Sequence, residues 1–203
     1  AHVRGGSGGP VLPLQGYPQR DACCHPIPSV LAEGYRVLCP DLRGAGWSSA
    51  PHSRYLKNEM ADDLAAVLDR LGVGPVKLVA HDWGGPVAFI MMLRHPAKVA
   101  GFFGVNTVAP YVKRDLASLR NLWRFWYQLP MALPVIGPLI IGDRKARFFR
   151  FLGSWVGGGF QLPDDDVALY VECMRQPGHA VAGSRWYRSF QATESLRWMR
   201  GEF

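Results

Sequence analysis

The chain has 203 residues, of which 48% are hydrophobic and 19% charged. This composition excludes a wholly disordered protein and fits one globular domain, or one domain with a sizeable insertion. The formal net charge of +7 comes mostly from single arginines scattered among apolar residues, so nucleic-acid binding is not predicted.

No apolar stretch approaches the ~18 residues of a membrane span, and no cationic segment followed by an apolar run opens the sequence. A reduced, cytoplasmic protein without membrane contact is therefore predicted. The four cysteines include no Cys-x-x-Cys pair, so neither a zinc site nor a redox motif is indicated. We expect no metal and no cofactor.

Short apolar runs alternate with helical patterns in the first half of the chain. The runs at 11–14, 35–39, 76–80 and 99–105 predict strands, although Pro13 is awkward in a central strand because it cannot donate to the ladder. Apolar residues at helical spacing predict helices over about 60–71 and 85–95. This alternation indicates a mostly parallel sheet with helices on both faces.

After Pro110 the pattern changes to longer helical segments rich in aromatic residues and arginine. These segments span 116–129, 143–155, 164–175 and 180–199. We therefore predict an α/β class protein with two regions. Residues 1–110 form the N-terminal part of an α/β core, and residues 111–200 form a helical cap.

The strongest chemical signal is Asp82, which follows the predicted strand at 76–80. A nucleophile at a sharp strand-to-helix turn needs small residues around it, here Ala80, Gly84 and Gly85. The backbone amide of Trp83 is then directed at the site, next to the positive end of the following helix. An aspartate that only caps the helix is the alternative, but the preceding apolar strand and the two glycines favour a nucleophile.

Three segments carry a resemblance to a known family. His-Asp-Trp-Gly-Gly at 81–85, together with Asp-Leu-Arg-Gly-Ala-Gly-Trp-Ser at 41–48, resembles the epoxide hydrolase and haloalkane dehalogenase branch of the α/β-hydrolases. Gln-Gly-Tyr-Pro at 15–18 matches the family's His-Gly-x-Pro turn except for its first residue. The resemblance implies an α/β-hydrolase fold with a helical cap, Asp82 as nucleophile, and an oxyanion hole made by the backbone amides of Tyr17 and Trp83.

The identity of the nucleophile indicates the substrate class. A carboxylate attacks an sp3 carbon that carries a strained oxygen or a halide, and water then attacks the carbonyl of the resulting alkyl-enzyme ester. Serine at position 82 would instead suit acyl transfer. A small apolar epoxide or alkyl halide is therefore the expected partner.

The cap is expected to supply hydrogen-bond donors for the leaving group. Tyr187 resembles the cap tyrosine that donates to an epoxide oxygen. A second donor is expected on the first cap helix, where the alignment indicates Trp123 and Tyr127 lies one turn further on. An indole N–H suits a halide as well as an epoxide oxygen. Asn106 stands where some dehalogenases place their catalytic acid, which favours an epoxide hydrolase.

The general base that the family uses for deacylation, a histidine after the cap, has no counterpart among the six histidines of the sequence. We therefore expect a fragment, cut at both ends, that lacks the C-terminal core segment. Three functions stay open: an epoxide hydrolase, a haloalkane or haloacid dehalogenase, and a truncated, catalytically incomplete binding protein.

Overall fold

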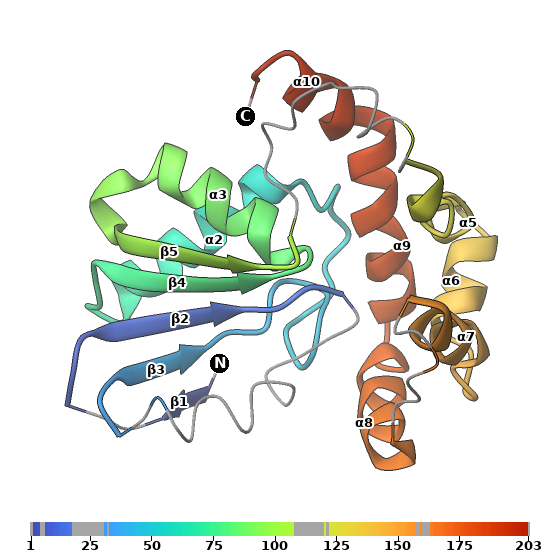
Figure 1. Cartoon of the computed structure of the whole chain (residues 1–203), viewed down its shortest axis with the longest axis horizontal. Helices are drawn as coiled ribbons and strands as arrows, with labels where there is room; N and C mark the ends of the chain where they lie inside the picture. The colour runs from blue at the N-terminus through green and yellow to red at the C-terminus, as the bar shows by residue number, and fades with distance from the viewer. Residues whose placement is uncertain are drawn as a thin grey trace.

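The computed structural model describes residues 2–4, 7–17, 31, 33–107, 120, 122–156, 159 and 163–202. Its strands form one five-stranded sheet in the order β1-β3-β2-β4-β5 (Figure 1). All neighbouring strands are parallel except β1, which pairs antiparallel with β3 at the edge. The strands are β1 (His2–Arg4), β2 (Pro10–Leu14), β3 (Arg36–Cys39), β4 (Val76–His81) and β5 (Val99–Val105). The predicted mostly parallel sheet is confirmed.

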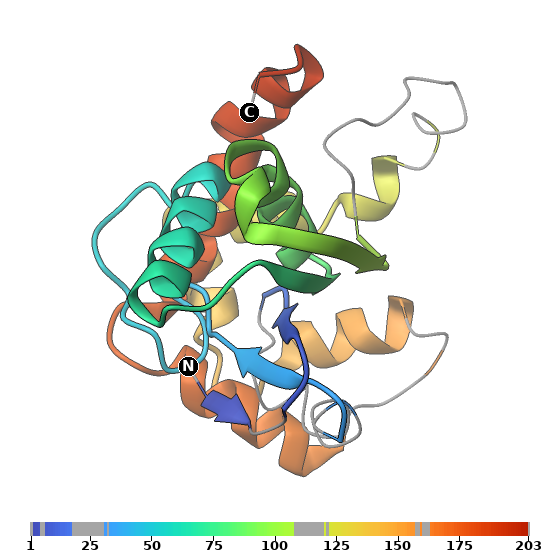
Figure 2. The same ribbon diagram turned by 90° about the vertical axis from the view of Figure 1, so that its left-hand side faces the viewer.

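Two long helices pack beside each other on one face of this sheet (Figure 2). They are α2 (Lys57–Arg70) and α3 (Gly84–Arg94), close to the predicted spans, and a short 3-10 helix, η2 (Pro96–Lys98), follows α3. The buried stripe of α2 includes Met60, Leu64 and Leu68, the four-residue spacing of one helical face. Helices were expected on both faces, and residues 18–30, which connect β2 to β3, lie outside the described residues.

Pro13 does lie within a strand in the middle of the sheet. The ladder between β2 and β3 joins only Pro10 with Arg36 and Val11 with Val37, whereas the ladder to β4 extends through Leu14. Pro13 therefore lies where β2 is paired on one side only. A proline is tolerated in such an edge-like position because no ladder hydrogen bond is required of it on the open side.

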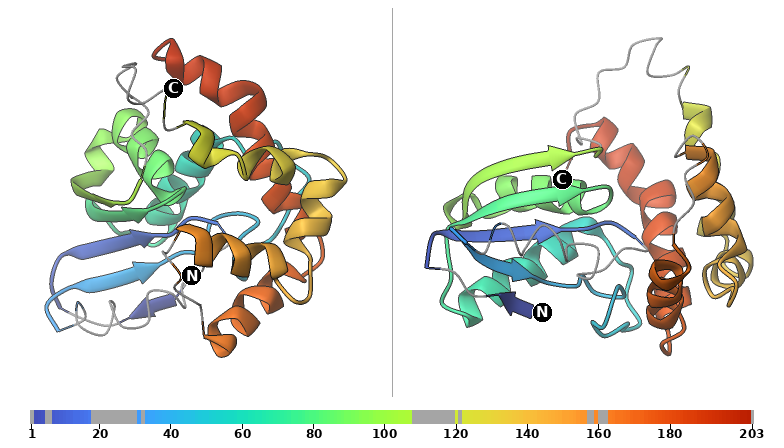
Figure 3. Two further views of the ribbon diagram at one scale, coloured as in Figure 1. Left: turned by 45° about the vertical axis from the view of Figure 1, so that its right-hand side comes forward. Right: turned by 60° about the horizontal axis from the view of Figure 1, so that its bottom comes forward.

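The cap stands at the carboxyl ends of β2, β4 and β5 (Figure 1). Its central helix, α9, lies between the sheet and the outer cap helices (Figure 3), and it packs against α5 and α6. The junction between core and cap, predicted near residue 110, lies outside the described residues. The elements are η3 (Leu122–Phe125), α5 (Gln128–Ala132), α6 (Ile136–Ile141), α7 (Arg147–Val156), α8 (Asp164–Met174), α9 (His179–Ser189), a π-helical turn η4 (Phe190–Glu194) and α10 (Ser195–Met199).

Two of the four predicted cap helices, over 143–155 and 164–175, correspond to α7 and α8. The helix expected over 116–129 is wrong in its described part, where a 3-10 turn ends at Phe125 and α5 begins only at Gln128. Pro130 lies in the first turn of α5. Backbone N–H groups there have no hydrogen-bond acceptor within the helix, so the absence of an N–H in proline costs no helical hydrogen bond. The segment 180–199 is helical as predicted, but the π-helical turn η4 divides it into the two α-helices α9 and α10.

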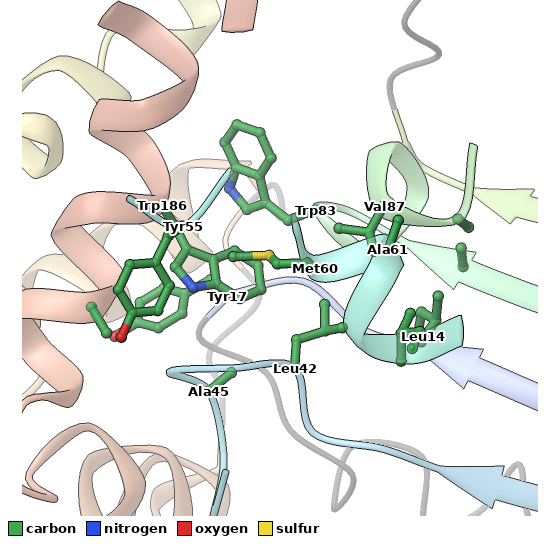
Figure 4. Packing of buried hydrophobic residues seen from close by; sticks show 14 of the residues in the cluster. Leu14, Tyr17, Leu42, Ala45, Tyr55, Met60, Ala61, Trp83, Val87 and Trp186 are labelled. Carbon is green, nitrogen blue, oxygen red and sulfur yellow. The ribbon is translucent and has the colours of Figure 1, made fainter. Parts of the chain in front are cut away.

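Core and cap share one hydrophobic cluster (Figure 4). Leu14 and Val87 from the core and Trp186 and Tyr187 from α9 belong to it, each with at most 3% of its surface exposed. The cap is thus continuous with the core rather than a separately packed unit. Among the described residues, no helix has the length and apolarity needed to span a bilayer, and no three metal-ligating side chains are grouped together.

Candidate active site

Asp82 lies at the sharp turn between β4 and α3. Its φ of +49° places it in the left-handed region, which is uncommon for any residue other than glycine. Its carbonyl oxygen accepts two hydrogen bonds, from the Gly85 backbone N–H at 3.0 Å and from the Thr107 hydroxyl at 2.7 Å. The strained backbone is thus held from two sides, in the sharp strand-to-helix turn that the sequence predicted.

Close approach of three loops explains the small residues around the turn. A Cβ on Gly84 would lie 2.5 Å from the Leu14 carbonyl oxygen, and one on Gly85 would lie 1.6 Å from the Thr107 hydroxyl. A Cβ on Gly16 would lie 1.9 Å from Oδ2 of Asp82 itself. The ends of β2, β4 and β5 therefore meet at Asp82, at the carboxyl edge of the sheet where open α/β folds bind their ligands.

Two backbone amides converge on the Asp82 carboxylate. They are the N–H groups of Trp83 and Tyr17, the pair expected from the sequence. Burial raises the pKa of Asp82, and the hydrogen bonds from these amides together with the charge of His81 partly offset that rise. The geometry thus combines a buried carboxylate with two donors that can bind an oxyanion.

Tyr187 reaches the same place from α9. It is 3% exposed, its ring stands edge-on to Trp83 at 5.5 Å and to Tyr17 at 6.3 Å, and its hydroxyl accepts a hydrogen bond from the Trp83 side chain. Burial, and then the charge of Asp82, raise the pKa of Tyr187 well above its usual value. The phenol therefore stays protonated and can donate.

The two candidates for a second cap donor are placed differently. Burial, and then the charge of Asp82, raise the pKa of Tyr127, so this hydroxyl lies within electrostatic reach of the carboxylate. Trp123 is 62% exposed, and its ring packs against Trp155 at 5.9 Å. Of the two, Tyr127 is therefore the candidate that the charge of Asp82 reaches, and Trp123 lies exposed on the cap surface.

Comparison with known proteins agrees with this geometry. The sequence model of the family described as alpha/beta hydrolase fold matches residues 9–133, more than half of the chain. The chain belongs to the α/β-hydrolase family. Within it, the relatives fall in the branch of epoxide hydrolases and dehalogenases named above.

Three relatives illustrate the similarity. A soluble epoxide hydrolase of Corynebacterium sp. (strain C12) is 28% identical over 92% of this chain and 67% of its own length. A fluoroacetate dehalogenase of Burkholderia sp. is 33% identical over 90% of this chain and 62% of its own length. The solved structure of the epoxide hydrolase CorEH without ligand superposes with a TM-score of 0.84 at 26% identity, over 94% of this chain and 69% of that one. This hydrolase chain thus spans about two thirds of the length of these relatives.

The second motif of this hydrolase, at 41–48, has an architectural role. The Arg43 carbonyl oxygen accepts the indole N–H of Trp186 at 3.2 Å, and the Ser48 carbonyl oxygen lies 3.0 Å from Nε2 of His179. Both partners belong to α9. The loop therefore fixes the cap helix that carries Tyr187.

Several histidines of the hydrolase have partners away from Asp82. Nε2 of His95 lies 2.7 Å from Asp62, and that of His52 lies 2.7 Å from a guanidinium nitrogen of Arg185. His179 contacts the Ser48 loop as described, whereas the charge of His81 lowers the pKa of Asp82. His25 lies outside the described residues.

Two residues that support the turn were missed in the sequence. Thr107 holds the Asp82 carbonyl, and Gly16 lies against the Asp82 carboxylate. Gly16 is part of the Gln-Gly-Tyr-Pro segment, so the family motif contained its signal. Thr107 follows β5 with no local pattern that distinguishes it from an ordinary loop threonine.

Proposed function

We propose that this hydrolase opens epoxides through an ester on Asp82. The observation that carries the proposal is the Asp82 carboxylate itself, which is buried at a strained turn, bound by two backbone amides and faced by tyrosines of the cap. A capping aspartate would need none of these features. They suit a nucleophile whose product ester must later carry an oxyanion.

In the first step, an Asp82 carboxylate oxygen attacks a ring carbon of the epoxide as the carbon–oxygen bond of the ring breaks. The ring oxygen takes up the electron pair and receives a hydrogen bond, and then a proton, from Tyr187 or Tyr127. The product is a 2-hydroxyalkyl ester of Asp82. Donors aimed at the developing alkoxide in a buried site provide the largest stabilisation available to such a step.

In the second step, water attacks the carbonyl of the ester, and the amides of Trp83 and Tyr17 bind the oxyanion that forms. A general base must remove a proton from that water. Among the described histidines, His52, His95 and His179 contact residues other than Asp82, and His81 adjoins it in the chain. We propose that the 203-residue chain forms the ester but does not turn over repeatedly.

A second reaction is favoured by one of the relatives. The fluoroacetate dehalogenase of Burkholderia sp. is 33% identical to this chain, and a carboxylate nucleophile also displaces halide from carbon. The same donors, Tyr187 and Tyr127, would then stabilise a departing halide ion. A third possibility is a binding protein that accommodates small apolar molecules without reaction at Asp82.

Intact-mass spectrometry distinguishes these functions. The chain is incubated with styrene oxide, and we expect one covalent adduct, mapped to the peptide that contains Asp82. Asp82→Asn is the matched control, since asparagine tolerates the left-handed backbone, and it should remain unmodified. Fluoroacetate and a chloroalkane are tested in parallel for release of halide.

Each outcome decides among the proposals. Halide release without an epoxide adduct would favour the dehalogenase. An adduct that forms equally in Asp82→Asn, or no reaction with any of these compounds, would contradict the nucleophile. Release of many equivalents of diol per chain would show that another residue acts as the base.

A further inference from the structure

A buried ion pair joins the first turn of α2 to the end of the cap. Nζ of Lys57 lies 2.8 Å from Oε2 of Glu194, and the two residues are 0% and 4% exposed. The ammonium also donates to the Trp186 carbonyl at 2.7 Å and to the Ser189 hydroxyl at 2.9 Å. All three of its protons therefore have acceptors, and every acceptor belongs to the cap.

Glu194 is held at both of its carboxylate oxygens. Oε1 accepts the backbone N–H of Lys57, the first residue of α2, at 2.6 Å. A carboxylate at this place satisfies one of the free N–H groups of the helix and interacts favourably with its dipole. Glu194 is the last residue of the π-helical turn η4, an irregularity that is frequent at functional sites.

Stability alone is a weak explanation for this pair. Removing two charges from water costs nearly as much as their attraction returns, and apolar replacements of similar volume are often equally stable. A buried pair that is fully satisfied does, however, fix the positions of its neighbours. The neighbours of Lys57 thus indicate what the pair does.

The Lys57 ammonium faces Trp83. Nζ lies 4.6 Å from the centroid of the indole ring, within the range of a cation–π interaction. The same indole packs edge-on against Phe190 at 5.1 Å and against Tyr187 at 5.5 Å, and it donates a hydrogen bond to the Tyr187 hydroxyl. The backbone amide of Trp83 binds Asp82. One residue of the core therefore connects the ion pair, the nucleophile and the cap tyrosine.

We propose that Lys57 and Glu194 are positioning residues that fix the Trp83 indole and, through it, the Tyr187 hydroxyl relative to Asp82. The consequence for catalysis rests on the proposed function of Asp82 and Tyr187. The fixation of the Trp83 side chain does not, because it follows from the contacts of the ion pair alone.

The test uses a variant that removes both charges together. Lys57→Met with Glu194→Gln leaves no unpaired charge, preserves volume, and keeps an oxygen for the first N–H of α2. Lys98→Met with Asp69→Asn is the matched control, because this Lys–Asp pair lies on the surface away from Trp83, with the Asp69 side chain 68% exposed. Thermal unfolding shows that each variant is folded.

The first measurement is the indole N–H resonance of Trp83 in a 1H–15N NMR spectrum, assigned by its loss in Trp83→Phe. In the charge-free variant we expect this resonance to shift or broaden, while that of the exposed Trp47 stays unchanged. The control variant should leave Trp83 unchanged. Lys57→Gln with Glu194→Gln, which also leaves no unpaired charge, is the second variant for the case where the first does not fold, and it should shift the same resonance. A Trp83 resonance unmoved by the removal of the charges would overturn the proposal.

The second measurement is the rate of Asp82 ester formation with styrene oxide. We expect the maximal rate constant to fall at least about 10-fold in the charge-free variant, with little change in the half-saturating concentration, because geometry rather than binding is affected. In a Tyr187→Phe background the loss should shrink to about 2-fold, since coupled residues are not additive. Equal losses in both backgrounds would overturn the coupling to Tyr187. The two proposals can fail separately. If the charge-free variant shifts the Trp83 resonance but the wild-type chain forms no ester, the proposed function is refuted and the positioning of Trp83 is still supported.

Discussion

Gly16→Ala tests whether the loop after β2 holds the Asp82 carboxylate in place. The added Cβ would lie 1.9 Å from Oδ2, 2.5 Å from Cγ and 2.6 Å from Cβ of Asp82, whereas ordinary contact begins at 3.4 Å. The shortfall at Oδ2 is about 1.5 Å. Rotation of the carboxylate cannot relieve it, because the Cβ of Asp82 is itself too close. The turn that carries Asp82, or the loop that carries Gly16, must therefore move.

A displacement of about 1 Å at a reacting group can cost on the order of 100-fold in rate. We therefore expect ester formation with styrene oxide to slow by about that factor in Gly16→Ala. Overpacking should also lower the free energy of unfolding by roughly 1–3 kcal/mol. The rate is followed by intact-mass spectrometry, and stability by thermal unfolding monitored by circular dichroism.

The matched control is Gly9→Ala. A Cβ on Gly9 has no atom within 4 Å, and neither Gly9 nor Gly16 has a positive φ, so alanine is compatible with the backbone at both positions. The control should react at the wild-type rate. If folded Gly16→Ala forms the ester within about threefold of the wild-type rate, the contact does not position the carboxylate, and the reasoning from close approach is wrong.

Further substitutions and a change of pH test the site. Tyr187→Phe should slow ester formation on the order of 100-fold, the effect typical of losing one donor to a developing oxyanion; an unchanged rate would exclude Tyr187 as the donor. Tyr127→Phe should slow the reaction more than Trp123→Phe. The reverse order would mean that Trp123, the residue that matches the family's second donor in sequence, provides the hydrogen bond. Because burial raises the pKa of Asp82, the rate should reach half its plateau above pH 3.8, the ordinary value for an aspartate, when measured across a pH series. The same raised pKa means that the stability of the wild-type chain decreases as pH rises through the pKa of Asp82. Asp82→Asn should therefore unfold at a higher temperature than the wild-type chain at pH 7, and this difference should disappear on acidification. An equal or lower unfolding temperature of Asp82→Asn at pH 7 would argue against a buried ionised carboxylate.

Local patterns in the sequence determined much of the core. The strands at 76–80 and 99–105 and the helices on either side of them follow from apolar runs and from helical spacing, which depend only on nearby residues. The elbow at Asp82 is equally local, because a sharp turn needs small residues within a few positions of its apex. In the described part of 116–129 the predicted helix was wrong, because helical spacing does not reveal where a 3-10 turn ends and an α-helix begins.

Tertiary structure decided which side chains surround Asp82. Successive residues on a helix point about 100° apart, so the choice between Trp123 and Tyr127 depends on helix boundaries and packing that the sequence leaves open. Lys57 and Glu194 are 137 positions apart in the chain, and no local pattern relates them. Gly16 and Thr107 meet the Asp82 turn only because β2, β4 and β5 are neighbours in the sheet. The sequence by itself therefore determined the strand-to-helix turn at Asp82 and predicted this residue as the nucleophile. The residues that surround Asp82 were decided by the fold, because distant segments come together only in three dimensions.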